Sequence, residues 1–291
     1  MGYGQHQSFY LRDRWLNKAI KHLKDNERLF YDKDAFEEMG LGKNMVQSLR
    51  YWVVATGVVH EKLNIERKKI HHITPLGQLI FKYDKFLKYN DTASILHYEM
   101  VNKREPSTSW FWFFNILNET LISRDNLQDE LIEWVSKNEN KGISDRSLKR
   151  DIDCLIKLYT AGQNSNDPEE VIQSPLNKLG LLEEKRGLII KRSLSEDDIG
   201  LSALMYILLD FKSKFDTENI SVDDLVQKSG LWGKVFNMSR TSIVNALNKL
   251  NNHNKFPLKF IRTNNLDLIR IPDVSPLEFL EYEYLLKNGV K

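Results

Sequence analysis

The sequence predicts a mainly α-helical fold of consecutive winged helix-turn-helix-like units, each closed by a short β-hairpin wing. Apolar residues recur at helical spacing over most of the chain, and paired strand-like segments follow such helices in three places. The 291 residues suffice for two or three small domains. We expect an N-terminal winged-helix domain at 1–82, a helical linking segment at 83–122, a second helix-turn-helix unit at 123–192, and a C-terminal winged-helix domain with a terminal helix at 193–291.

The first unit is organised around a helix at 41–56, entered through the turn at Gly40 and Gly42. Its buried face is made by apolar residues at helical spacing: Met45, Val46, Leu49 and Val53. Its open face carries polar residues: Lys43, Asn44, Gln47, Arg50 and Tyr51. Arg and Lys suit phosphate or guanine, and Asn and Gln suit adenine edges, so we predict a DNA-recognition helix. An ordinary surface helix shows the same pattern, and the neighbouring elements favour the recognition helix.

Those neighbours are a helix at 11–23, a short helix capped by Asp32, and a predicted hairpin. The hairpin strands are 58–62 and 68–74. Its cations are Lys62, Arg67, Lys68 and Lys69. Glu61 and Glu66 oppose them, so the four positive and two negative charges leave +2. A basic hairpin beside a polar helix is typical of a surface that follows DNA phosphates.

The middle of the chain predicts buried helices. Pro75 starts a helix that reaches Phe81, and a second helix lies within 84–102. The run from Trp110 to Phe114 is wholly aromatic and predicts a buried helix at the centre of the fold. Base stacking is the alternative, but stacking surfaces usually have basic residues between the rings, and this run has none.

The helix-turn-helix order recurs twice. In the second unit Ser123 caps a helix, a second helix runs over 144–159, and 181–191 forms a hairpin after a flexible loop at 162–168. The second helix exposes further candidate DNA contacts: Arg146, Lys149 and Arg150.

In the third unit Asp197 or Asp198 caps a helix at 201–215. Ser221 and Ser239 begin two more helices, and 259–271 forms a hairpin. The last helix of this unit supplies two weaker DNA-contact candidates, Arg240 and Lys249. A terminal helix spans 276–287.

Composition limits the functional classes. The net charge of +2 means that a nucleic-acid surface must be a local patch. The single cysteine, Cys154, excludes an internal disulfide framework and a Cys-rich zinc site, and it is consistent with a reducing, cytoplasmic location. No stretch has the roughly 20 apolar residues of a membrane span, so we expect no membrane partner.

Catalytic and metal-binding patterns are missing from the sequence. It contains neither a nucleotide-binding loop nor a His-Glu-x-x-His motif. We expect His97 to be a satisfied interior group, and Asp151 and Asp153 to be ion-pair partners of cations on their own helix. His6 lies in a compact polar cluster whose role the sequence leaves open. We therefore predict a protein that is not an enzyme, with no cofactor and no metal.

Several stretches resemble an uncharacterised bacterial family, a domain of unknown function. The matching stretches are Tyr3–Phe9, Leu11-Arg12 with Trp15-Leu16 and Lys18-Ala19, Leu41–Val46 with Arg50–Trp52, Asp91-Thr92 leading to Leu96-His97, Trp110–Asn115, Leu148–Asp153 to Tyr159, and Pro175-Leu176 to Leu179–Leu181. Gln5 departs from the family, whose members have Gly before the His. Members are often encoded beside phosphoadenosine-phosphosulfate-reductase-like proteins in DNA-phosphorothioation and phage-defence gene clusters. The resemblance thus implies a DNA-modification or defence context.

These observations predict a non-enzymatic protein that binds double-stranded DNA in a phosphorothioation-type modification or phage-defence system. Two alternatives stay open, a protein-interaction scaffold for other proteins of the same gene cluster and a transcriptional regulator. The near-neutral charge and the acidic helix at 276–287 favour the scaffold. An enzyme with a dispersed site is a third possibility.

Overall fold

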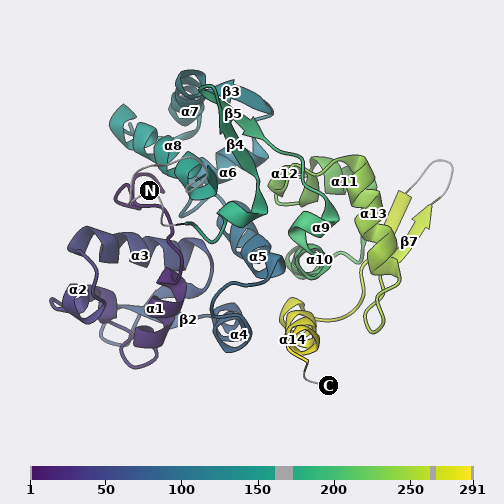
Figure 1. The fold of residues 1–291 in the computed structure, drawn as a ribbon, viewed down its shortest axis with the longest axis horizontal. Helices are drawn as coiled ribbons and strands as arrows, with labels where there is room; N and C mark the ends of the chain where they lie inside the picture. The colour runs from purple at the N-terminus through teal and green to yellow at the C-terminus, as the bar shows by residue number, and fades with distance from the viewer. Residues whose placement is uncertain (1, 161–172, 263–266, 290–291) are drawn as a thin grey trace.

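The computed structural model describes residues 2–160, 173–262 and 267–289. In these residues the fold is mixed α/β: helices predominate, and the strands form small antiparallel sheets (Figure 1). The predicted flexible loop at 162–168 and the turn at 263–265 lie outside the described residues.

The N-terminal part contains the predicted helices and hairpin. Its elements are α1 (Trp15–Leu23), the 3-10 turn η1 (Leu29–Tyr31), α2 (Ala35–Glu38), α3 (Lys43–Ala55), β1 (Val59–Leu63), β2 (Lys69–Ile73) and α4 (Pro75–Tyr83). The two strands pair antiparallel, from Val59 opposite Ile73 to Leu63 opposite Lys69. Thr74 caps α4, because its side chain accepts a hydrogen bond from the Gly77 amide at 3.0 Å. The short helix α2 follows Asp34 rather than the predicted cap Asp32.

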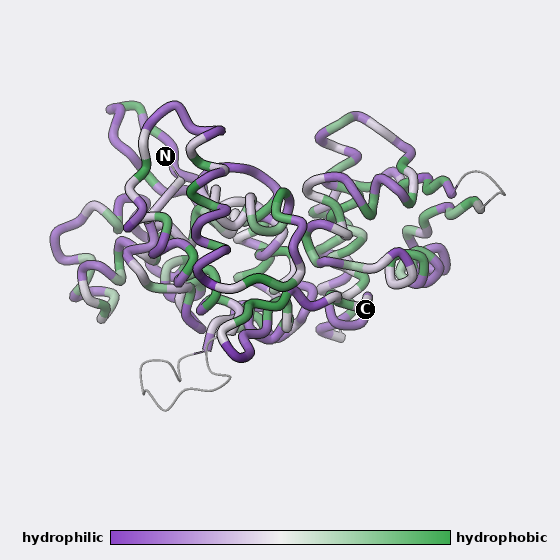
Figure 2. Tube along the Cα trace, turned by 90° about the horizontal axis from the view of Figure 1, so that it is seen from above, coloured by the Kyte–Doolittle hydropathy of each residue, from purple (hydrophilic) through white to green (hydrophobic). Residues whose placement is uncertain are grey.

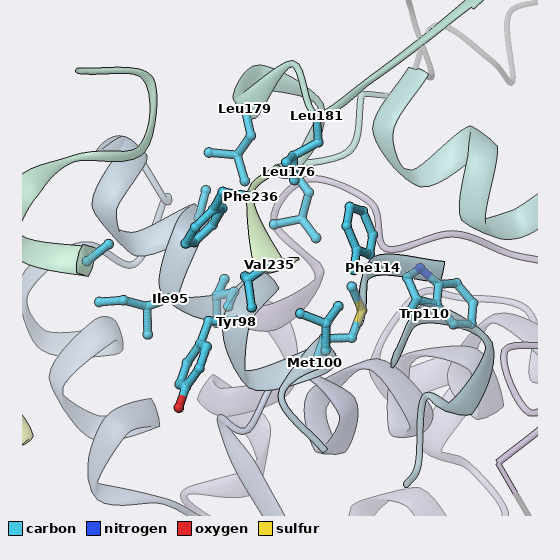
Figure 3. Close-up of a cluster of buried hydrophobic side chains, with 14 of the residues drawn as sticks. Ile95, Tyr98, Met100, Trp110, Phe114, Leu176, Leu179, Leu181, Val235 and Phe236 are labelled. Atoms are coloured by element: carbon cyan, nitrogen blue, oxygen red, sulfur yellow. The ribbon is translucent and has the colours of Figure 1, made fainter. Parts of the chain in front are cut away.

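The middle part is α5 (Asn90–Val101) and α6 (Thr108–Asn115). The prediction of a buried aromatic helix is confirmed, since Trp110, Trp112, Phe113 and Phe114 of α6 are at most 4% exposed. Helix α5 is central and packs against both α6 and α10 (Leu201–Phe215) (Figure 1). Figure 3 shows Ile95, Tyr98 and Met100 of α5 among buried side chains from distant parts of the chain.

The second part contains β3 (Leu121–Ser123), α7 (Arg124–Asn138), α8 (Asp145–Thr160), η2 (Asn177–Leu179), β4 (Leu182–Lys185) and β5 (Leu188–Lys191). Its sheet has the order β3-β5-β4. The predicted cap is confirmed, since Ser123 accepts a hydrogen bond from the Asn126 amide at 3.2 Å. Strand β3 was not predicted.

The third part repeats this arrangement with α9 (Glu196–Ile199), α10, β6 (Asn219–Ser221), α11 (Val222–Gln227), α12 (Trp232–Val235), α13 (Arg240–Asn251), β7 (Lys259–Arg262), β8 (Asp267–Arg270) and α14 (Pro276–Lys287). Its sheet has the order β6-β8-β7. The predicted cap Ser239 is confirmed, and Ser221 caps the predicted short helix α11. The predicted cap of α10 is wrong. Ser195 instead caps the short α9 and forms a capping box with Asp198. Helix α10 begins after Gly200.

One buried histidine joins these parts. His97 of α5 is fully buried, and its Nδ1 lies 2.8 Å from the Tyr159 hydroxyl of α8. Its Nε2 lies 2.8 Å from the Val235 carbonyl oxygen of α12. The prediction of a satisfied interior group is confirmed. Cys154 is buried too, and burial raises the pKa of its thiol.

Hydrophilic and hydrophobic residues alternate along the chain (Figure 2), as expected of helices with one buried face. In the described part of the chain, no helix is both long enough and apolar enough to span a membrane.

Candidate nucleic-acid interface

Helix α3 offers a polar face beside the hairpin. Lys43, Asn44 and Gln47 are exposed on it, while the opposite side of the helix is buried. Gly42 is the residue before the helix and has an extended backbone conformation. Because glycine has no side chain, it supplies no capping hydrogen bond. Arg50 is half-buried, and its guanidinium lies 5.4 Å from the centroid of the Tyr31 ring.

Tyr51 corrects the predicted set of DNA contacts. It is only 5% exposed, so it cannot face a DNA groove from this position. The cause is the N-terminal loop, which covers this side of α3. The Phe9 carbonyl oxygen accepts hydrogen bonds from Ser48 Oγ at 3.1 Å and Trp52 Nε1 at 2.9 Å. The Tyr51 hydroxyl is buried, has no hydrogen-bond partner among the described residues, and burial raises its pKa well above the ordinary value.

The hairpin β1–β2 exposes all four predicted cations. Two of them form ion pairs with carboxylates, Lys68 with Glu66 at 2.7 Å and Lys69 with Glu61 at 2.6 Å. Lys62 and Arg67 have no carboxylate partner in the described part of the chain. The turn also presents Ile65, which is fully exposed. These two cations are therefore the ones most available to phosphate.

A polar network joins the hairpin to Tyr31 of η1, and Arg50 of α3 lies against the same ring. The Tyr31 hydroxyl donates a hydrogen bond to Glu61 at 2.9 Å, and Lys69 binds the other oxygen of the same carboxylate. Burial of Glu61 opposes its ionisation, but the hydrogen bonds from Lys69 and Tyr31 outweigh burial and lower its pKa. The buried ring of His71 lies 3.5 Å from Glu61, and burial lowers its pKa to about 4. His71 is therefore uncharged at neutral pH.

A cavity of about 360 Å³ opens where the N-terminal loop, α3 and the hairpin meet. Its polar lining consists of Gln5, Gln7, Gln47, Arg50, Glu61 and Lys69. Gln5 and Gln7 were not predicted as site residues, and the compact polar cluster around His6 was their only signal in the sequence.

The same loop is anchored to α8 through a buried carboxylate. Asp151 Oδ1 lies 2.9 Å from His6 Nε2 and accepts a hydrogen bond from the Gly4 amide at 2.8 Å. Its Oδ2 accepts a hydrogen bond from Ser109 Oγ at 2.6 Å. This corrects the predicted partners of Asp151, because the N-terminal loop and Ser109 of α6 supply its hydrogen-bond partners. Asp153 pairs with Arg124 at 2.9 Å, from another helix.

The start of α8 therefore lies beside the loop that covers α3. Arg146 and Lys149 are exposed there, and Arg150 is half-buried with one guanidinium nitrogen 3.5 Å from Ser147 Oγ. A Cβ placed on Gly4 would come 3.2 Å from the same nitrogen of Arg150. The structure thus brings Gln47 and Arg50 of α3, Lys69 of the hairpin and Arg150 of α8 close to the same N-terminal loop.

The two C-terminal candidates lie elsewhere and are neutralised. Helix α13 is at the opposite side of the molecule from α3 (Figure 1). Arg240 pairs with Asp223 and Asp267, and Lys249 pairs with Glu196 at 3.0 Å and Asp197 at 2.8 Å. These carboxylates reduce the positive potential that α13 offers to DNA.

The chain is similar to two solved structures, a magnesium ion-bound crystal structure of SspB and a crystal structure of SspB. Both are 22% identical to this chain, and both alignments cover 99% of this chain and 88% of the other. The TM-scores are 0.88 for the magnesium-bound structure and 0.87 for the other, so the fold is shared. No curated protein sequence matches the chain. A family model described as "Protein of unknown function (DUF4007)" matches residues 3–284, and the chain therefore belongs to the DUF4007 family.

Proposed function

We propose that this protein binds double-stranded DNA, without acting on it chemically, in a phosphorothioation-type DNA-modification or phage-defence system. The observation that carries the proposal is the arrangement of the open face of α3, the cations of the β1–β2 hairpin and the start of α8 around the N-terminal loop. Cations and amides are the groups that contact phosphates and base edges.

The proposed units are winged helices. The order strand, helices, strand, strand occurs in the second and third parts, and the strand before the helices pairs with the last strand in both. In the first part, helices α1 to α3 precede a two-stranded hairpin. This order supports the proposal that α3 is the recognition helix and that the hairpin is the wing along the phosphates.

The biological context rests on family resemblance. The sequence resemblance implies a family that is often encoded beside phosphoadenosine-phosphosulfate-reductase-like proteins in phosphorothioation and phage-defence clusters, and we propose that context for this chain. Membership in DUF4007 and the shared fold of SspB are consistent with that context. We further propose a cytoplasmic location and binding to other proteins of the cluster.

One of the two similar SspB structures is bound to a magnesium ion. Within the described ranges of this chain, no cluster of three or more His, Cys, Asp or Glu side chains is arranged to hold a metal ion. We assign no residue of this chain to a metal.

The test is a fluorescence-anisotropy titration of labelled duplex DNA at two salt concentrations. It compares wild type with the combined Arg67→Ala, Lys68→Ala and Lys69→Ala variant. Each lost phosphate contact lowers the salt slope by about one. A matched control, combined Arg240→Ala, Lys249→Ala and Lys255→Ala, removes three positive charges from the C-terminal part and should bind like wild type.

Three results would contradict the proposal. These are no salt-dependent binding at micromolar protein, identical binding by wild type and the hairpin variant, or equal losses in both variants. A second experiment tests the non-enzymatic part. Supercoiled plasmid incubated with the protein and magnesium should stay supercoiled, and conversion to open circles would show that the protein cuts DNA.

A further inference from the structure

A larger groove lies on another side of the N-terminal part, between α1, α4, the loop that follows α4, and the end of α14. Its volume is about 930 Å³. Ligand pockets in proteins measure roughly 300–1,000 Å³, so the groove is near the upper end of that range. None of the predicted DNA contacts lines it.

The end of α4 and the loop that follows it contribute a repeated pair of residues to this groove. A lysine followed by an aromatic residue occurs every three positions, and all six side chains line the groove: Lys82, Tyr83, Lys85, Phe86, Lys88 and Tyr89. Aromatic rings alternating with cations are typical of surfaces that bind single-stranded nucleic acid, where bases stack on rings and phosphates meet cations.

The carboxylate inside the repeat organises the loop and forms no ion pair with the lysines of the repeat. Asp84 is only 3% exposed and accepts hydrogen bonds from the amides of Lys88 at 2.7 Å and Tyr89 at 3.1 Å. It also accepts one from the Thr92 hydroxyl at 2.7 Å. Its oxygens are therefore occupied by the backbone that follows.

The rings differ in their availability. Tyr83 stacks on Tyr284 at 5.8 Å between ring centroids, so α14 holds it in place. The Tyr89 hydroxyl donates a hydrogen bond to the Lys287 carbonyl oxygen at 3.3 Å. Phe86 is 48% exposed, and Lys85 lies 5.1 Å from its centroid. Phe86 is thus a large apolar ring held open beside a cation.

The lysines also differ. Lys82 pairs with Glu281 at 3.2 Å. Lys85 and Lys88 are exposed and have no acidic partner in the part of the chain that the structure describes. Lys24 adds a further cation, 4.2 Å from the centroid of Phe81 at the groove wall.

We propose that this groove binds single-stranded nucleic acid, with a base stacked on Phe86 and neighbouring phosphates facing Lys85 and Lys88. Duplex DNA is a poor occupant, because its bases are stacked on one another and cannot cover an isolated ring. The proposal stands apart from the duplex interface on α3 and the hairpin, and either can fail alone.

The experiment measures anisotropy of a fluorescein-labelled oligothymidylate of about ten nucleotides. Phe86→Ala should weaken binding about tenfold or more, since each stacked base contributes substantially to affinity. Phe86→Trp should retain binding. Combined Lys85→Ala and Lys88→Ala should weaken binding and lower the salt slope by about two.

Matched controls separate these effects from general ones. Phe215→Ala removes another exposed ring, 66% exposed at the end of α10, and should bind like wild type. Combined Lys255→Ala and Lys259→Ala removes two exposed lysines of the C-terminal part and should also bind like wild type. The exposure of Phe86 means that Phe86→Ala should fold normally, which a thermal melt checks. Loss of duplex binding by the hairpin variant, with retained oligothymidylate binding, would show that the two sites are separate.

Competition identifies the ligand. Unlabelled oligothymidylate should displace the probe far better than thymidine monophosphate or oligoglutamate. Equal displacement by the monophosphate would overturn the proposal of a single-stranded nucleic acid in favour of a mononucleotide. Equal displacement by oligoglutamate would overturn it in favour of an acidic peptide. No binding of the probe at micromolar protein, or unchanged binding by Phe86→Ala, would also overturn the proposal.

Discussion

His6 Nε2 and Asp151 Oδ1 lie 2.9 Å apart in the protein interior, although the two residues are 145 positions apart in the sequence. His6 is 1% exposed and Asp151 is fully buried. The pair attaches the N-terminal loop to α8, and the same loop binds α3 through the Phe9 carbonyl oxygen. The position of the proposed interface thus depends on one buried carboxylate.

Replacing that carboxylate should therefore destabilise the protein strongly. Asp151→Ala leaves His6, the Gly4 amide and the Ser109 hydroxyl without their acceptor, and we expect a loss of ~3 kcal/mol in the free energy of unfolding. Denaturant unfolding measures this loss. Asp153→Ala is the control on the same helix. Its pair with Arg124 is partly exposed, so its loss should be about 1 kcal/mol or less. Equal losses would mean that the buried network contributes little.

Removing the hydroxyl of Tyr51 should have the opposite effect on stability. The hydroxyl is buried without a partner among the described residues, so Tyr51→Phe should raise the free energy of unfolding by roughly 1 kcal/mol and leave DNA affinity unchanged. Tyr31→Phe is the comparison, because it loses a hydrogen bond to Glu61 and should be destabilising. Weaker DNA binding by Tyr51→Phe would restore the tyrosine as a contact.

The wrong prediction for Tyr51 arises because helical periodicity does not report contacts made by a distant segment of the chain. Periodicity placed α3 and three of the four residues of its buried stripe correctly, with Met45 only half-buried, because burial against neighbouring helices repeats with the helical period. The covering of its other side comes from the loop around Phe9, some forty residues earlier, and no local pattern reports it. The partners of Asp151 were wrong for the same reason.

The two unpredicted strands have a more local cause. β3 and β6 are three residues long and run directly into the helix caps Ser123 and Ser221. A helix start dominates such a sequence, and only pairing with β5 and β8 makes these segments strands. The Lys-aromatic repeat in 82–89 was present in the sequence, but its meaning depends on the groove that α1 and α14 complete.

The open face of α3 gives a prediction about base recognition. If the protein prefers a sequence, Asn44→Ala or Gln47→Ala should cost roughly 1–3 kcal/mol on the preferred duplex and little on others. Competition between the preferred and a scrambled duplex measures the difference. A uniform loss on every duplex would assign these residues to phosphate contacts instead.

Acid should weaken the packing around His97. Burial lowers the pKa of His97 to about 4, against an ordinary value of 6.5. Between these values the unfolded chain binds a proton that the folded chain does not, so stability falls as pH drops from 6.5 to 4. The shift corresponds to a loss in the free energy of unfolding on the order of 3 kcal/mol.

His97→Phe should be less stable than wild type at pH 7, because the Val235 carbonyl oxygen loses its donor. The difference in stability between the two proteins should narrow on acidification. Tyr159→Phe loses one hydrogen bond and keeps the titrating ring, so it should show the same acid sensitivity as wild type. Denaturant unfolding at several pH values distinguishes the variants, and a gap between wild type and His97→Phe that stays constant down to pH 4 would show that His97 does not cause the acid sensitivity.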